Sequence, residues 1–321
     1  MVAAAAAALG VGAAAPAQRS GDAIRQPAPE SAVSRERPCT MERTAQWTVK
    51  SKSGRLFEIS LALPKGAAPA SGYPIIYVLD ADTSFATLVD TVRNQEQMFG
   101  PTVVVGIGYP SEAEVANRLF DFTPPTDRST LPAAAPGGWG ATGGADGFRA
   151  FLQDELKPMI EARVSVDRSR QALFGHSLGG LFVLHVLLTR PDAFNVYVAG
   201  SPSIWWGDRQ ILKEVAPFEA AQRRTGVRRR LLITVGGLET RLSPEELRAS
   251  MAMKLPNPDA EFRRMNMVGN ATEMATRLLK LSKQGLEVDF ALFPDETHNS
   301  VIPAYLGRGA RFALSGWLSG W

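Results

Sequence analysis

The sequence predicts an α/β fold in which helices cover both faces of a mostly parallel, eight-stranded sheet. Six short apolar segments are continuous rather than alternating, which is typical of strands buried on both faces of a parallel sheet. They span residues 74–79, 103–107, 172–174, 196–199, 231–235 and 288–293. The intervening stretches include segments with helical periodicity, at residues 85–97, 147–162, 178–189, 244–255 and 271–284. Helices can therefore pack on both faces of the sheet.

The N-terminal part of the chain is predicted to lie outside this fold. Residues 1–17 form an uncharged, Ala-rich run that is too short to span a bilayer and ends in Ala15-Pro16-Ala17, a small-x-small pattern. We interpret it as a signal peptide and expect the protein to be periplasmic or secreted, with no transmembrane segment. Residues 18–43 are rich in Pro, Ser, Arg and Ala without a hydrophobic period, as expected of a mobile leader.

Residues 44–321 are predicted to form one domain. The segments 45–50 and 56–63 alternate between apolar and polar residues around the sequence Ser51-Lys52-Ser53-Gly54, which predicts a hairpin and brings the number of strands to eight. With 45% apolar and 21% charged residues, a chain of 321 residues can bury a sizeable core. No internal repeat or second hydrophobic core divides it.

Charge and cysteine content exclude several function classes. The formal net charge is +3, and the one dense basic cluster, at residues 223–230, is interpreted as a solvated turn before a strand because no aromatic residues interleave with it. We therefore expect no nucleic-acid partner. The single Cys39 excludes an intramolecular disulfide, and three histidines make a metal site unexpected, so neither a metal nor a cofactor is predicted.

The chemistry is predicted to centre on Ser177. The strand at 172–174 runs into Gly175-His176-Ser177-Leu178-Gly179-Gly180 and then into the helical segment 178–189. A strand, a sharp turn with small residues around a serine, and a helix in this order form a nucleophile elbow. The sequence therefore predicts the α/β-hydrolase fold, with the serine hydroxyl at the carboxyl edge of the sheet.

A serine hydroxyl needs a base to remove its proton, and the chain has three histidines. His176 adjoins the serine on the elbow and is expected to point elsewhere, while His185 lies eight positions into the helix and is too far away. His298 follows the last predicted strand at the same edge of the sheet, so elimination assigns the base to His298.

The acid that orients His298 is expected after the strand at 231–235. Glu239 lies there, and the order Ser177, Glu239, His298 is that of α/β-hydrolases. Asp295 and Glu296, in the His298 loop, are the alternatives, and Glu239 could also be a solvated loop carboxylate. For the oxyanion hole we expect the backbone amides of Leu178, directly after the nucleophile, and Ala81, after the third strand.

Several motifs together resemble the esterase D-like branch of the α/β-hydrolases, which includes the enterobactin and salmochelin esterases. The resemblance covers roughly residues 45–318. The matching segments are YVLD at 77–80, RLFDFTP at 118–124, GGADGF at 143–148, GHSLGG at 175–180, SPSIWW at 201–206 and HNSV at 298–301. Two departures are Ala81, where many members have Gly, and Phe122 in place of Tyr.

The resemblance implies that an ester is hydrolysed through an acyl-Ser177 intermediate. For the siderophore branch it implies the opening of a cyclic triserine trilactone that carries catecholates, in its iron-bound or iron-free form. Arg118 is then a candidate to bind the anionic substrate, with an ion pair to Asp121 as the alternative. Trp205 and Trp206 are candidates to stack on aryl groups, with packing on the core as the alternative.

Other functions remain open on the same scaffold. The runner-up is a general carboxylesterase, a feruloyl-type esterase or an acyltransferase. A non-catalytic binding protein with the hydrolase fold is a more remote alternative, because such a protein has no need of both Ser177 and His298.

Overall fold

The computed structural model describes residues 40–111, 116–132 and 139–318. The predicted signal peptide at 1–17 and most of the leader lie outside the described residues. Within residues 40–43, Met41 packs against the core and the Arg43 side chain donates from Nε to the Pro64 carbonyl at 2.8 Å. The last residues assigned to the leader therefore contact the domain.

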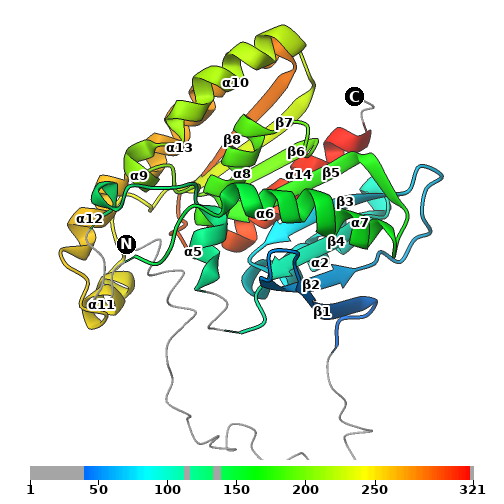
Figure 1. Ribbon diagram of the computed structural model, residues 1–321, viewed down its shortest axis with the longest axis horizontal. Helices are drawn as coiled ribbons and strands as arrows, with labels where there is room; N and C mark the ends of the chain where they lie inside the picture. The colour runs from blue at the N-terminus through cyan, green and yellow to red at the C-terminus, as the bar shows by residue number, and fades with distance from the viewer. Residues whose placement is uncertain (1–39, 112–115, 133–138, 319–321) are drawn as a thin grey trace, which may run out of the picture.

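Eight strands among the described residues form one sheet in the order β1-β2-β4-β3-β5-β6-β7-β8 (Figure 1). β2 pairs antiparallel with β1 and β4, and all other neighbours are parallel. The strands are β1 (Thr44–Lys50), β2 (Leu56–Ala62), β3 (Tyr73–Leu79), β4 (Val103–Gly108), β5 (Val166–His176), β6 (Val196–Gly200), β7 (Arg229–Gly236) and β8 (Leu286–Phe293). The prediction of eight strands in a mostly parallel sheet is confirmed.

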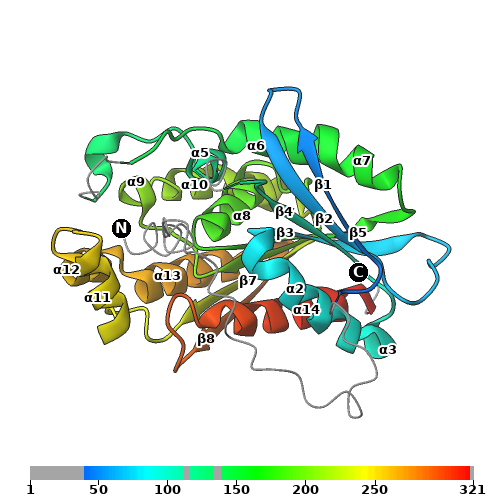
Figure 2. The same ribbon diagram turned by 90° about the horizontal axis from the view of Figure 1, so that it is seen from below.

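Helices cover both faces of this sheet. The α-helices are α2 (Ala81–Asn94), α3 (Glu96–Phe99), α5 (Asn117–Phe122), α6 (Ala145–Phe151), α7 (Lys157–Glu161), α8 (Leu178–Thr189), α9 (Trp206–Arg209), α10 (Leu212–Thr225), α11 (Pro244–Ala252), α12 (Pro258–Met265), α13 (Met267–Leu279) and α14 (Val301–Leu318). The π-helical turn η2 (Leu152–Leu156) joins α6 to α7, and 3₁₀ turns lie at η1 (Arg128–Thr130) and η3 (Ser282–Gln284). Helices α2 and α14 pack together on one face (Figure 2), while α8 and α13 pack on the other.

The unbroken apolar strands follow from this two-sided cover. Along β3, Tyr77 and Leu79 belong to the core cluster that contains α8, whereas Ile76 and Val78 belong to the cluster that contains α2 and α14. Successive side chains of a strand point to opposite faces, so both sets must be apolar. The carboxyl ends of the parallel strands are left free to carry functional loops.

The interpretation of the basic cluster as one solvated turn is correct only in part, because Arg223, Arg224 and Arg228 are exposed but the cluster extends over a helix end and a strand. Arg223 and Arg224 are in the last turn of α10, where a positive charge is favourable beside the helix C-terminus, and Arg230 is buried in β7 and paired with Glu287. No helix was expected at α10, which contains Pro217, a residue that usually ends helices.

Among the described helices, none is long and apolar enough to cross a membrane.

Candidate active site

Ser177 stands on the sharp turn between β5 and α8. Its backbone has φ 60° and ψ −120°, a conformation that is strained for a residue with a side chain. Close approach of the surrounding backbone requires glycine at two positions. A Cβ on Gly175 would collide with the Gly179 carbonyl oxygen, and a Cβ on Gly180 would lie 2.8 Å from the Gly200 carbonyl oxygen. The elbow that the sequence predicts is therefore present, although Gly180 is more crowded than Gly179.

The structure brings Ser177, His298 and Glu239 together in a continuous hydrogen-bonded chain. Nδ1 of His298 lies 2.6 Å from Oε2 of Glu239, and Nε2 lies 3.0 Å from the Ser177 hydroxyl oxygen. An ionised carboxylate can only accept, so Nδ1 carries the ring proton and Nε2 is free to accept the serine proton. All three residues are at least 96% buried.

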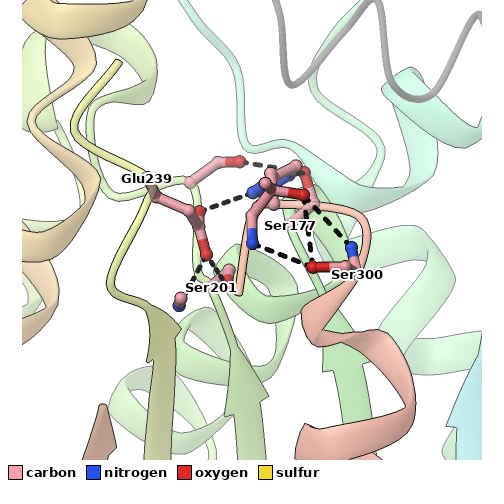
Figure 3. Close-up of polar contacts among 8 residues, drawn as sticks. Ser177, Ser201, Glu239 and Ser300 are labelled. Carbon is pink, nitrogen blue, oxygen red and sulfur yellow. Dashed lines mark hydrogen bonds and ion pairs between the residues drawn. The ribbon is translucent and has the colours of Figure 1, made fainter. Parts of the chain in front are cut away.

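Glu239 is held by two further donors on its other carboxylate oxygen. Oε1 accepts from the Gly236 amide at 2.8 Å and from the Ser201 hydroxyl at 2.5 Å (Figure 3). Of the alternative acids, Glu296 accepts from the Ser300 hydroxyl instead, within the loop that follows β8. The geometry thus favours Glu239 as the partner of His298.

Sequence reasoning missed Ser201. It is fully buried directly after β6, with a left-handed φ of 40°. The signal available in the sequence was its position, because loops at the carboxyl ends of neighbouring parallel strands meet at one edge of the sheet.

The expectation that His176 points away from the site was wrong. Its ring lies beside the His298 ring, with the centroids 4.6 Å apart, and stacks on Tyr305 at 5.6 Å. Burial, together with the nearby His298 and Arg118, holds the pKa of the His176 imidazole well below its ordinary value. The base is therefore flanked by an uncharged ring. His185 is far from the serine, as expected, and contacts the Glu214 carboxylate at 2.9 Å.

Comparison with known proteins identifies the family of this chain. The family model Esterase matches residues 51–267, about two thirds of the chain. The chain belongs to this esterase family. It is therefore a carboxylic ester hydrolase, as the sequence predicted.

Named relatives of this esterase extend the similarity over most of the chain. It is 40% identical over 267 residues to the ferri-bacillibactin esterase BesA of Bacillus subtilis, covering 81% of this chain and 85% of that protein. It is 34% identical over 291 residues to the siderophore enterobactin esterase of Emericella nidulans, covering 86% and 95%.

Solved structures show the same fold. The BES protein from Bacillus cereus superposes with a TM-score of 0.73 at 34% identity, covering 87% of the esterase and 98% of that chain. The siderophore hydrolase EstA from Aspergillus nidulans gives a TM-score of 0.73 at 31% identity, covering 88% and 98%. The prediction of an α/β-hydrolase fold is confirmed.

The two amides expected in the oxyanion hole each begin a helix of the esterase. Leu178 is the first residue of α8 and Ala81 the first residue of α2. Neither amide donates to another residue within the ranges that the structure describes. Ala81 has no positive φ, so glycine is not needed there, and its methyl group lies over Gly106 of β4.

Arg118 and the two tryptophans are largely buried. Arg118 pairs with Asp80 rather than with Asp121, and only 11% of its side chain is exposed. Trp206 has no exposed surface, and its indole N–H donates to Thr126 at 2.8 Å. Trp205 is 7% exposed and, like Trp206, belongs to the core cluster that contains α8. Arg118 therefore forms an ion pair, the kind of contact expected as its alternative role, but with Asp80 in place of Asp121. Trp206 packs in the core, as its alternative role expected. Trp205 also lines a cavity together with Arg209 and Asn270, so its stacking on aryl groups stays a prediction.

Proposed function

We propose that this protein is a siderophore esterase that cleaves its substrate through an acyl-Ser177 intermediate. The observation that carries the proposal is the buried chain of hydrogen bonds from Glu239 through His298 to Ser177. The similarity to proteins named siderophore esterases, over more than four fifths of the chain, supports the choice of substrate.

In the first half of the proposed reaction, Ser177 attacks the ester carbonyl while Nε2 of His298 takes its proton. The resulting imidazolium lies 2.6 Å from Glu239, whose negative charge stabilises it. The amides of Leu178 and Ala81 would bind the oxyanion, and the positive end of α8 favours the same charge. When the tetrahedral intermediate collapses, His298 returns the proton to the departing alcohol.

In the second half, water hydrolyses the acyl-Ser177 ester. His298 again accepts a proton, now from the attacking water, and gives it back to Ser177 as the acid product leaves. Both halves use the same side chains and backbone amides, and water is the second nucleophile. Among the described residues, no group of three or more His, Cys, Asp and Glu could hold a metal ion. Any iron would enter as part of the substrate.

The substrate is tested by incubating the protein with iron-free and ferric enterobactin and following the products by mass spectrometry. We expect the linear trimer to accumulate, at a rate that falls to background for Ser177→Ala. If micromolar enzyme leaves both forms intact but hydrolyses p-nitrophenyl acetate, enterobactin is refuted as the substrate, and a general carboxylesterase, feruloyl-type esterase or acyltransferase is favoured instead. If a fluorophosphonate probe leaves the serine unlabelled, the protein is a non-catalytic binding protein.

We further propose that the protein is exported to the periplasm or the medium. The support is the Ala-rich segment at residues 1–17, which ends in a small-x-small pattern. The intact mass of protein recovered from a host's periplasm or medium should correspond to a chain that has lost these residues. Recovery of uncleaved chain in the cytoplasm alone would contradict export.

A further inference from the structure

A buried ion pair joins three segments around the nucleophile. Nε of Arg118, on α5, donates to Oδ1 of Asp80 at 2.5 Å, and Nη2 donates to Oδ2 at 2.7 Å. Only 11% of the Arg118 side chain and 13% of the Asp80 side chain are exposed. A two-pronged contact of this kind fixes the direction as well as the distance between its partners.

Asp80 holds the backbone conformation that precedes the Ala81 amide. It directly follows β3 in a left-handed conformation, with φ 55° and ψ 58°, which is uncommon for a residue with a side chain, although aspartate adopts it more readily than most. Its carbonyl oxygen accepts from Thr83 and Ser84 at the start of α2. Its carboxylate makes no helix cap and is directed to Arg118 instead. The pair therefore stabilises the turn that sets the direction of the Ala81 amide.

Arg118 and Asp80 also contact the nucleophile elbow. Nη2 of Arg118 lies 3.4 Å from the His176 carbonyl oxygen, next to Ser177 in the chain. Oδ2 of Asp80 would lie 3.3 Å from a Cβ at Gly179. The guanidinium also packs over the Phe122 ring, with its central carbon 4.9 Å from the ring centroid. The pair thus lies between the two segments that supply Leu178 and Ala81.

This arrangement commits most of the Arg118 guanidinium to Asp80. Nε and Nη2 contact the carboxylate, while the third nitrogen, Nη1, is buried and has no hydrogen-bond partner among the described residues. An anionic substrate would have to compete with a carboxylate that is already in place.

We propose that Arg118 is a positioning residue: by holding Asp80, it sets the Ala81 amide at the correct distance from the Leu178 amide. The inference rests on the proposed function and adds to it how the oxyanion hole is assembled. A donor displaced by about 1 Å can lose about 10²-fold in rate, so the pair should affect kcat although it does not touch the substrate.

The test compares Arg118→Gln with wild type on a neutral ester, p-nitrophenyl acetate, and an anionic one, p-nitrophenyl hemisuccinate. We expect kcat to fall by roughly 10²-fold for both esters while KM stays within about threefold. Asp80→Asn should have a similar effect, and the double variant should be no worse than either single variant, because the two side chains act as one unit. Arg118→Lys keeps the positive charge but can make only one of the two contacts with Asp80, so we expect it to retain part of the activity. It replaces Arg118→Gln in the test if that variant does not fold.

A trifluoromethyl ketone gives a second readout, because its adduct with Ser177 carries the negative oxygen that the two amides would bind. Its affinity should fall in parallel with kcat. Arg55→Gln is the matched control, since Arg55 forms a comparable pair with the buried Asp121 of the same helix, at 2.7 Å. This control should keep its kcat and its affinity for the ketone.

Three outcomes would overturn the inference. They are a rise in KM confined to the anionic ester, additive losses in the double variant, and an equal loss of kcat in Arg55→Gln. None of these refutes the esterase mechanism, which fails separately if the wild-type protein hydrolyses neither ester.

Discussion

Ser177→Ala is expected to lower kcat for p-nitrophenyl acetate by about 10⁶-fold, the loss typical when the nucleophile of a serine hydrolase is removed. The reason is that the hydroxyl lies 3.0 Å from Nε2 of His298, which can activate it only if the oxygen is present. His298→Ala should cost about as much, and the double variant little more, because the two groups act in one step.

Steady-state rates are the measurement, with a fluorophosphonate probe and peptide mapping to locate the labelled residue. Ser250→Ala is the matched control, because Ser250 is also buried but lies on α11. It should keep wild-type activity. Activity of Ser177→Ala within tenfold of wild type, or a label on another residue, would show that Ser177 is not the nucleophile.

Glu239→Gln is expected to lower kcat by about 10⁴-fold, and the structure explains why a side chain of the same shape fails. The Gly236 amide and the Ser201 hydroxyl both donate to Oε1. The oxygen of a glutamine amide would take that position, which leaves its NH₂ group facing Nδ1 of His298. The ring would then accept at Nδ1 and carry its proton on Nε2, the wrong tautomer to receive the serine proton.

A matched variant completes this test, with kcat for p-nitrophenyl acetate as the measurement. Asp295→Asn removes an exposed carboxylate from the His298 loop and should stay within about threefold of wild type. If Asp295→Asn or Glu296→Gln were instead the damaging change, with Glu239→Gln nearly active, the acid would have to be reassigned.

Much of the fold could be read from local patterns. The continuous apolar segments predicted β3 to β8 because strands covered on both faces need apolar residues at every position. The helix at Leu178–Thr189 has the bounds that its pattern predicts. Helix α10 was missed because Pro217 interrupts the local pattern, whereas packing against α8 stabilises the helix.

The candidate active site shows the same difference between what local sequence patterns predict and what tertiary packing decides. The sequence alone predicted Ser177 and His298, because the elbow has a local signature and three histidines allowed elimination. For the acid, the chain order favoured Glu239 but left Asp295 and Glu296 as alternatives. Only the tertiary structure decided the partners of these residues. Asp80, and not the nearby Asp121, pairs with Arg118, Ser201 supports Glu239, and both tryptophans are buried. These contacts join residues tens of positions apart in the chain. The connections between the strands determine which of these residues meet, whereas sequence periodicity shows only on which face of its element each residue lies.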